Sequence, residues 1–359
     1  MKNNFKPYPV GKIMNPLQKK YKDISPKYKK VTIKYPSRLE AMALDPAKIT
    51  ENKNMIYKAG QIDFNVKLFK KISIKAIKDK KTIIKNKTSR NTLIKHSVAL
   101  MKDVLDFDHG IQVEVDDPIN LRHCGLGSSS SLISGVAVAI NELYGNPIER
   151  QTLVKYLVQN HGEEIDGQKD MLMPVQAIGG SANCGTHPGG MIVIAGESVV
   201  IQTMDIGKDY EVIIGIPEGF KHPDSKELME KEQENFENFS NCGNEFSEKI
   251  AYRILHEVFP AMKEKDLEVI GNLIADYRYD MGSIKNCSFV YPPIVRIADN
   301  LRILRKNGHA DILSMSSVGP GMFAITKEPE ICNKFFKENS LRTIKTKIYN
   351  GKYKVLKAN

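Results

Sequence analysis

The chain has 359 residues, of which 41% are hydrophobic and 26% charged, with a formal net charge of +11, so it is neither disordered nor fibrous. It contains no run of about 18 apolar residues that would predict a membrane span, and its first residues lack the apolar core of a signal peptide. Its five cysteines show no paired spacing, so we expect a cytoplasmic protein without a disulfide framework.

The basic residues are spread along the chain. Their densest runs, 67–81 and 347–357, alternate with apolar residues and predict strands with solvated faces. No aromatic and basic residues interleave as in a nucleic-acid module, so we expect no nucleic-acid partner. The positive charge is either a lysine-rich surface or a field that draws in anionic small molecules.

The first part of the chain mixes strand and helix patterns. In chain order, we expect an irregular arm over 1–30, a strand running into a turn over 31–44, strands over 64–79, a helix over 91–107, a strand over 110–119, and helices over 131–145 and 149–162.

The second part continues without a repeat. We expect three strands over 189–206 and 210–217, a mobile loop or exposed helix over 221–245, helices over 249–262, 267–281 and 293–308, and a strand, glycine turn and strand over 311–326. Strands and helices do not alternate strictly, which favours an α+β fold in two lobes. The stretch 221–245 is also a candidate lid over a site.

The stretch CGLGSSSSL, from Cys124 to Leu132, lies between a predicted strand and an apolar helix. Gly125 and Gly127 allow a tight turn and a close approach to a ligand. The serines that follow would form the first turn of the helix, where free N–H groups and the helix dipole attract anions. The stretch therefore predicts a site for phosphate or diphosphate. It lacks the G-K-[ST] ending of a Walker loop.

Three stretches together resemble the GHMP superfamily, which includes galactokinase, homoserine kinase and mevalonate kinase. PINLRHCGLGSSSSL over 118–132 resembles its phosphate loop, YPSRLEAMALD over 35–45 its N-terminal motif, and SMSSVGPGMFAIT over 314–326 its C-terminal glycine motif. The resemblance implies a two-lobed α+β fold, with an N-terminal lobe related to ribosomal S5 domain 2 and a ferredoxin-like C-terminal lobe. It divides the chain into the arm (1–30), the N-terminal lobe with the phosphate loop (31–205) and the C-terminal lobe (206–359).

Two features resemble a non-kinase branch of that superfamily, the beta-ribofuranosylaminobenzene 5'-phosphate synthases. GHMP kinases usually carry an Asp in a segment like S-G-x-D, and the matching segment here, 179–194, has no acidic residue. The C-terminal motif contains SSVGP over 316–320, and PSRL stands at 36–39. Glu40 and Val318 depart from the branch, which tends to have His and Trp there.

This resemblance implies a decarboxylating C-ribosyltransferase. Its substrates would be phosphoribosyl pyrophosphate and an aromatic or heteroaromatic carboxylic acid, its products would include CO₂ and diphosphate, its cofactor would be Mg²⁺, and it would be a homodimer. Pterin-cofactor or C-nucleoside biosynthesis is the implied setting. The alternative is an ATP-dependent small-molecule kinase in which Asp166 or Asp170 replaces the missing Asp. A ligand-binding regulator without catalysis and a nucleic-acid binder are further alternatives.

The resemblance also implies which residues form the site. The ligand-binding set comes from the phosphate loop and the C-terminal motif: Gly125, Leu126, Gly127, Ser128, Ser129, Ser130, Ser131, Ser316, Ser317, Gly319 and Gly321. The catalytic set is Arg38, His123, Asp166, Ser181 and His187, and the predicted metal ligands are Asp166 and Asp170.

Each of these side chains also has an ordinary structural role open to it. Arg38 would clamp a phosphate or a carboxylate, or form a surface salt bridge. His123 would donate to the leaving diphosphate, or be a solvated loop residue. Asp166 and Asp170 would hold Mg²⁺ or ribose hydroxyls, or stay in water at helix ends. A glycine-rich segment contains Gln176, Ser181, Asn183 and His187, and we expect it to face the cleft.

Overall fold

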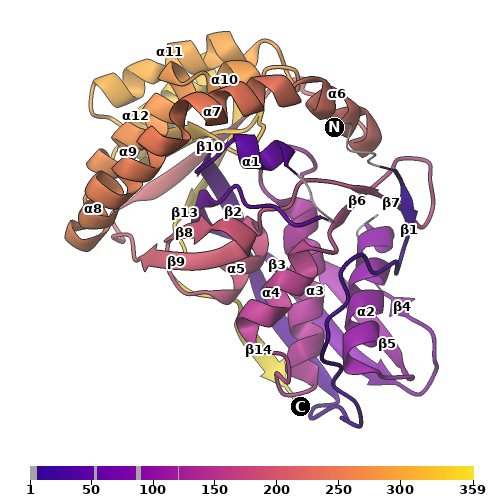
Figure 1. Ribbon diagram of the computed structural model, residues 1–359. Coiled ribbons are helices and arrows are strands. Elements are labelled where there is room, and N and C mark those ends of the chain that lie inside the picture. Colours follow the sequence, from indigo (N-terminus) through magenta and orange to yellow (C-terminus); the bar gives the residue numbers. More distant parts are fainter. Residues whose placement is uncertain (1–5, 52–54, 86–89, 120) are drawn as a thin grey trace.

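The computed structural model describes residues 6–51, 55–85, 90–119 and 121–359 (Figure 1). Residues 1–5 of the predicted arm and Asn120 of the predicted phosphate loop lie outside these ranges. Helices and strands are mixed in two sheet-and-helix units, which confirms the predicted α+β class. Within the described ranges, no helix is both long and apolar enough to cross a membrane.

The larger sheet has seven strands in the order β14-β2-β3-β5-β4, with β8 beside β3 and β9 beside β8. Their bounds are β2 Lys30–Ala43, β3 Gln61–Ile77, β4 Ile83–Ile84, β5 Gly110–Asp116, β8 Met191–Ala195, β9 Val199–Met204 and β14 Lys354–Ala358. The second half of β3 alternates buried and exposed residues, the pattern of a sheet with one face in water. The predicted strands over 31–44, 64–79 and 110–119 therefore belong to one sheet.

β2 is a continuous strand rather than a strand running into a turn. Pro36 cannot donate to a neighbouring strand, and the pairing with β3 shifts register between Pro36 and Ser37, and again between Glu40 and Met42. Such bulges re-aim side chains. They bracket Arg38 and Glu40, which both line the pocket described below.

Helices cover one face of the larger sheet (Figure 1). They are α2 Asn91–Leu105, α3 Ser128–Leu143, α4 Arg150–Val158 and α5 Gly180–Thr186. α3 is almost entirely buried, because its apolar sequence packs against β2, β3, α2 and α5. The core there includes Tyr35, Ile72, Val98, Val136 and Ile140. This packing presents the first turn of α3, with its serines, at the edge of the sheet.

The smaller sheet has the strand order β11-β12-β10-β13, with every pair antiparallel. Its strands are β10 Glu211–Pro217, β11 Ile312–Met315, β12 Met322–Thr326 and β13 Leu341–Lys347. In chain order, helices separate β10 from β11, and α12 Pro329–Glu338 separates β12 from β13. This is the β-α-β-β-α-β arrangement of a ferredoxin-like unit, as the resemblance to the GHMP superfamily implied.

Several helices gather on the outer side of this sheet (Figure 1). They are α6 Ser225–Glu234, α7 Phe236–Arg253, the π-helical turn η2 Ile254–Val258, α8 Phe259–Glu264, α9 Leu267–Ala275, the π-helical turn η3 Asp276–Asp280, α10 Ser283–Asn286 and α11 Ile294–Lys306. The short elements α1 Ala47–Thr50 and η1 Gly196–Ser198 complete the helical parts.

A third, small sheet has the order β1-β7-β6. Its strands are β1 Tyr8–Pro9, β6 Gly162–Glu164 and β7 Met171–Pro174. The predicted arm is largely irregular, but Tyr8 is buried, and its hydroxyl donates a hydrogen bond to the His161 carbonyl oxygen at 2.9 Å. The arm therefore supports the strand that carries Glu163.

One apolar cluster joins the two larger units. It contains Leu39 and Phe64 from the larger sheet, Val212 and Phe323 from the smaller sheet, and Ile270 from α9. The rings of Phe64 and Phe323 meet edge to face with centroids 6.1 Å apart. The last strand, β14, also returns to pair with β2. The division of the chain into two lobes after residue 205 stays a prediction. The strand β14 follows that point in the chain but belongs to the larger sheet.

Three segments differ in part from what the sequence patterns predicted. The glycine-rich segment after residue 179 forms the unpredicted helix α5 before β8 begins. The stretch 221–245 is helical, one of its two predicted alternatives, but α6 lines a pocket with one face. After residue 328, α12 and β13 were not predicted, whereas β14 overlaps the strand pattern over 347–357.

Candidate active site

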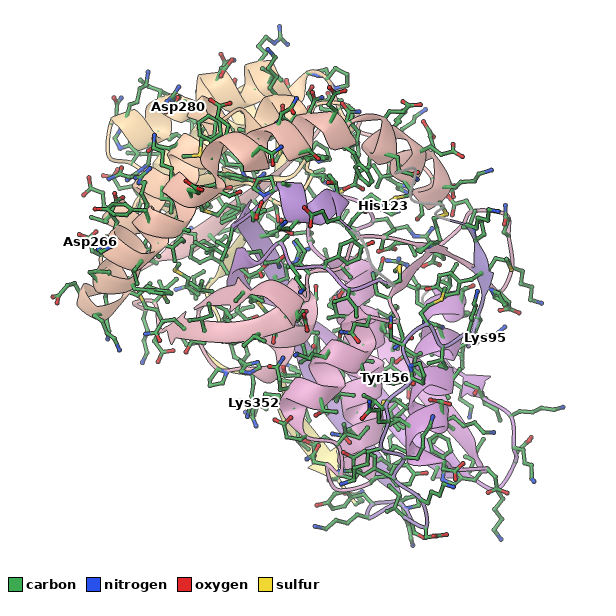
Figure 2. All side chains as sticks on the ribbon, viewed as in Figure 1. Lys95, His123, Tyr156, Asp266, Asp280 and Lys352 are labelled. Atoms are coloured by element: carbon green, nitrogen blue, oxygen red, sulfur yellow. The ribbon has the colours of Figure 1, made fainter. Side chains whose placement is uncertain are left out.

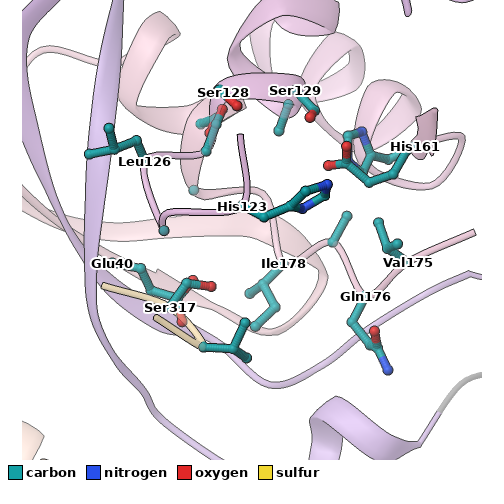
Figure 3. Close-up of a pocket in the computed structure, with 18 of the residues that line it drawn as sticks. Glu40, His123, Leu126, Ser128, Ser129, His161, Val175, Gln176, Ile178 and Ser317 are labelled. Atoms are coloured by element: carbon teal, nitrogen blue, oxygen red, sulfur yellow. The ribbon is translucent and has the colours of Figure 1, made fainter. Parts of the chain in front are cut away.

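A pocket opens where four segments meet: the loop before α3, the segment before α5, the inner face of α6 and the turn between β11 and β12 (Figure 3). In the close-up, Ser128 and Ser129 lie on one side of His123, and Glu40, Gln176, Ile178 and Ser317 lie on the other. We call the first side the loop wall, formed by residues 125–130 with His161 and Glu163. We call the second side the far wall, formed by Glu40, Gln176, Ile178, Met229, Glu232 and Ser317.

The two glycines of the loop adopt left-handed backbone conformations, with φ of +80° at Gly125 and +60° at Gly127. A Cβ on Gly125 would lie 2.2 Å from the Ser316 carbonyl oxygen, and one on Gly127 would lie 2.3 Å from Ser181 Oγ. Only glycine fits both the conformation and the space. The loop is therefore clamped between the β11–β12 turn and the start of α5.

The first turn of α3 has no side-chain cap. The first N–H groups of a helix have no partner within it, and here they carry the positive end of a 16-residue helix toward the pocket. Ser128, Ser129 and Ser130 line the pocket beside them, whereas the Ser131 hydroxyl is buried and donates to the Ser128 carbonyl oxygen. The geometry is that of an anion site.

The C-terminal motif holds the loop in place. Ser316 Oγ donates to the Gly125 carbonyl oxygen at 2.7 Å and accepts from the Glu40 backbone N–H at 3.0 Å. A Cβ on Gly321 would lie 2.3 Å from the Cys124 carbonyl oxygen. Ser316 and Gly321 therefore position the loop from behind, while Ser317 and Gly319 line the pocket itself.

Arg38 links the loop to two carboxylates. Its Nη1 donates to the Gly125 carbonyl oxygen at 2.9 Å, its Nη2 lies 3.4 Å from Glu40 Oε2, and its Nε lies 3.6 Å from Asp63 Oδ1. Burial raises the pKa of Asp63 to about 7, against the opposing charge of Arg38. Arg38 is thus a half-buried part of the pocket rather than a surface salt bridge.

A second charged network surrounds Glu163 on the loop wall. Arg90 contacts the hydroxyls of Ser128 and Ser129, pairs with Glu164, and lies 3.5 Å from Glu163. His161 Nε2 lies 3.5 Å from the other Glu163 oxygen. Burial would raise the pKa of Glu163, but His161 and the nearby positive groups outweigh it and hold the pKa at about 2. Glu163 is therefore an ionised carboxylate beside the start of α3.

His123 lies between the two walls. Its Nε2 is 3.2 Å from the Ser225 hydroxyl of α6, and its ring centroid is 5.8 Å from that of His222. Burial lowers the pKa of His123 from its ordinary value, and the neighbouring positive groups act in the same direction. His123 connects the loop wall to α6.

The structure brings some of the predicted residues together and leaves others outside. Arg38, His123 and Ser181 line the pocket with the loop, and Ser181 Oγ donates to the Gly127 carbonyl oxygen at 3.2 Å. His187 caps the far end of α5 and does not line this pocket.

The two predicted metal ligands lie at the surface. Asp166 is exposed and pairs with Arg122 at 3.2 Å, and Asp170 pairs with Lys95 at 2.7 Å. Figure 2 shows Lys95 far from His123, on the outer side of the molecule. Among the residues that the structure describes, no group of three or more His, Cys, Asp or Glu side chains could hold a metal ion. A cation here would need phosphate oxygens or water as further ligands.

Sequence reasoning missed several pocket residues: Gln61, His161, Glu163, Ser225 and Glu232, with Asp63 and Arg90 directly behind them. One signal was available. Gln61, Asp63 and Asn65 are polar residues at alternate positions of a strand, and all three are buried. Buried polar residues with that period mark a face that packs against polar partners. The other missed residues carry no such pattern.

Comparison with known proteins places this site in a family context. Residues 92–180, from α2 to the start of α5, match the family model "GHMP kinases N terminal domain". Over 115 residues the chain is 30% identical to homoserine kinase of Natranaerobius thermophilus. That match spans 32% of this chain and about a third (32%) of the relative's length.

Solved structures share the arrangement over nearly the whole chain. Homoserine kinase from Cytophaga hutchinsonii superposes with a TM-score of 0.61 and 13% identity, covering 92% of this chain and 99% of that one. Galactokinase of Lactococcus lactis complexed with galactose gives 0.65 and 11%, covering 91% and 95%. Mevalonate pyrophosphate decarboxylase of Streptococcus pyogenes gives 0.60 and 16%, covering 92% and 98%. At these identities the likeness defines the fold.

The molecule is thus an α+β protein whose pocket opens at a helix N-terminus. More particularly, it has the GHMP kinase fold, and its residues 92–180 match the family model of the GHMP kinase N-terminal domain.

The finer resemblance to the ribosyl-transferring branch is not supported. The expected decarboxylating C-ribosyltransferase, with phosphoribosyl pyrophosphate and an aromatic carboxylic acid as partners, is wrong, because the matching sequence is a homoserine kinase and the similar structures include homoserine, mevalonate and galactose kinases. The error has a structural reason. In SSVGP, Ser316 holds the loop from behind, a role that suits any phosphate donor. The segment 179–194 forms α5, whose Ser181 braces the loop.

Proposed function

We propose that this protein is an ATP-dependent small-molecule kinase, which transfers the γ-phosphoryl group of ATP to a hydroxyl of a small acceptor. The observation that carries the proposal is the anion loop at the start of α3, which opens into a pocket with a separate polar far wall. The GHMP kinase N-terminal domain match, which includes this loop, supports it.

The loop wall binds the phosphates in this proposal. Backbone N–H groups at the start of α3 and the hydroxyls of Ser128, Ser129 and Ser130 donate to phosphate oxygens. Arg90 orients two of these hydroxyls and is itself fixed by Glu164. The donors are thus held in position before the nucleotide arrives, which favours stabilisation of charge that develops during transfer.

The residues on the loop wall fit a magnesium ion. Glu163 is ionised, lines the pocket and stands near the serine hydroxyls of α3, and Mg²⁺ in nucleotide sites needs one or two carboxylates besides phosphate oxygens and water. Glu163 would hold the ion. When bound, Mg²⁺ neutralises negative charge on the phosphates.

The far wall receives the acceptor. The acceptor oxygen forms a bond to the γ-phosphorus, the bond from that phosphorus to ADP breaks, and the hydroxyl proton passes to Glu40. Glu40 lines the wall and is held 3.4 Å from Arg38, so it can accept the hydrogen bond of the acceptor hydroxyl and orient it. Arg38 also contacts the loop through Gly125, and therefore couples the acceptor side to the phosphate side.

The test has two arms. Calorimetry with Mg²⁺ and a non-hydrolysable ATP analogue measures nucleotide binding, and ADP release is then measured with homoserine, mevalonate, galactose and a panel of other small alcohols. The proposal expects nucleotide binding and ADP release that depends on an alcohol and yields its phosphate ester. Absence of nucleotide binding by the folded protein would overturn it. The homodimer stays a prediction, which sedimentation can check.

A further inference from the structure

Helix α6 presents two different faces. Ser225, Leu228, Met229 and Glu232 line the pocket, and their spacing of three and four residues places them on one side of the helix. The charged residues of the outer face pair with one another: Lys226 with Glu230 at 3.9 Å, and Lys231 with Glu227 at 2.8 Å. Glu232 is the charged residue that α6 turns inward.

Glu232 is 9% exposed, and its carboxylate has no hydrogen bond or ion pair with any residue in the described part of the chain. Buried carboxylates are ordinarily paired, because an isolated buried charge is costly. Burial and, after it, the charge of Glu40 raise the pKa of Glu232 to about 7. The carboxylate of Glu232 therefore has no positive partner among the residues that the structure describes.

The charges around the far wall do not balance. Three carboxylates, Glu40, Asp63 and Glu232, stand against two guanidinium groups, so that one negative charge remains when all are ionised. Arg38 is engaged by Gly125, Glu40 and Asp63. The second guanidinium, of Arg278, donates to backbone carbonyl oxygens and serine hydroxyls, and it has no carboxylate partner within the described ranges.

The far wall holds a second polar side chain without a partner among the described residues. Gln176 lines the same wall, and neither its amide nitrogen nor its amide oxygen has a hydrogen-bond partner among the described residues, although both atoms are buried. Figure 3 places Gln176 on the same side of His123 as Glu40. Ile49, Ile178, Met229 and Val318 supply an apolar part of the pocket lining. Unpaired polar groups beside such an apolar surface mark a place that a ligand completes.

We infer that Glu232 binds a cationic group of the acceptor, so that the substrate class is an amino alcohol with a short apolar skeleton. The ammonium of such a molecule would supply the missing positive charge at Glu232, and its methylene groups would lie against the apolar wall. Its hydroxyl would face Glu40 and the loop. This inference rests on the proposed function for the fate of the hydroxyl, but the binding of the ammonium can be tested alone.

The experiment is calorimetric binding to the full chain, without nucleotide and with the Mg²⁺ complex of the ATP analogue. The probes are short straight-chain amino alcohols and the diols of the same chain lengths, which differ only in the charged end. The expected result is that the amino alcohol of the preferred length binds about tenfold or more tightly than its diol. Equal binding of every amino alcohol and its diol would overturn the inference.

Two substitutions on α6 test whether the carboxylate of Glu232 causes the preference for the amino alcohol. Glu232→Gln keeps the shape of the side chain and removes the charge, so the preference for the amino alcohol should disappear. Glu230→Gln makes the same change on the exposed face of the same helix and should leave the preference intact. A preference that survives Glu232→Gln overturns the inference, provided that circular dichroism shows both variants to be folded.

Failure of this inference can be told from failure of the proposed function. If the nucleotide binds and diols are phosphorylated at the same rate as amino alcohols, the kinase proposal is supported and the proposed substrate class is wrong. If amino alcohols bind with the predicted dependence on Glu232 but no nucleotide binds, the ammonium site is supported and the kinase proposal is wrong.

Discussion

The two walls of the pocket differ in how completely the protein satisfies its own polar groups. On the loop wall, Arg90 is engaged by two serine hydroxyls and two carboxylates, and Glu163 has Arg90 and His161 beside it. On the far wall, the buried amide of Gln176 has no hydrogen-bond partner among the described residues. The carboxylate of Glu232 forms no hydrogen bond or ion pair with them.

This difference indicates which ligand each wall serves. A wall whose side chains hold one another is organised before binding, and it suits a ligand that is the same in every reaction, such as the phosphates of a nucleotide. A wall with unpaired buried groups is completed by its ligand, and it discriminates against molecules that leave those groups unpaired. The far wall is therefore where specificity within this fold should be found.

The strongest way to break the loop wall is to add a Cβ to the loop. Gly125→Ala would place a methyl group 2.2 Å from the Ser316 carbonyl oxygen at a φ of +80°, so backbone must move. We expect a loss of roughly 2–4 kcal/mol in the free energy of unfolding and a loss of nucleotide binding of about a hundredfold. Denaturant unfolding and calorimetry with the ATP analogue measure these effects.

A matched control separates the clash from the backbone conformation. Gly167 has a φ of +76°, but a Cβ there would meet nothing within 4 Å. Gly167→Ala should lower the free energy of unfolding by only about 1–2 kcal/mol and leave nucleotide binding unchanged. Equal effects of the two substitutions would show that the loop is not clamped as described.

The next largest effect should come from the carboxylate of the loop wall. Glu163→Gln removes the charge that lies beside Ser128 and Ser129 but keeps the shape of the side chain. We expect alcohol-dependent ADP release to fall by about tenfold to a hundredfold and to require more Mg²⁺. A magnesium titration of the initial rate measures both. An unchanged magnesium dependence would remove Glu163 from the proposed role.

The unpaired carboxylate of the far wall should make the free energy of unfolding depend on pH. Burial raises the pKa of Glu232 from 4.5 to about 7, so between these pH values the folded protein holds a proton that the unfolded chain releases. The free energy of unfolding of the wild type, relative to Glu232→Gln, should therefore fall by roughly 3 kcal/mol as the pH rises from about 4.5 to 7. Denaturant unfolding of both proteins across this range tests it, and parallel curves would contradict it.

The smallest effect is expected where the sequence predicted metal ligands. Asp166 and Asp170 form exposed pairs with Arg122 and Lys95, outside both walls. Asp166→Asn and Asp170→Asn should change the free energy of unfolding by no more than about 0.5 kcal/mol and leave ADP release nearly unchanged. These variants are also controls for Glu163→Gln. A large loss of activity would show that the surface carboxylates take part in the reaction.

The parts of the fold that the sequence predicted are those with a local signature. The alternation in β3 and β5 and the apolar spacing of α2 and α3 indicate strands and helices at the right places, because a period of two or of 3.6 residues reflects the geometry of the element itself. The α5 helix lacks such a pattern. Its seven residues are buried, small and polar, and packing rather than periodicity makes them helical.

The candidate site shows the same contrast between features set by local sequence and features set by tertiary packing. By itself, the sequence determined the anion loop, since Gly125, Gly127 and the serines act through their own backbone and through the helix that they begin. Only the tertiary structure decided that Glu163 and Glu232 face the same pocket, and that Asp166 and Asp170 do not. The reason is physical: a turn and a helix start are set by neighbouring residues, whereas the burial and pairing of a charge depend on which distant segments fold against it.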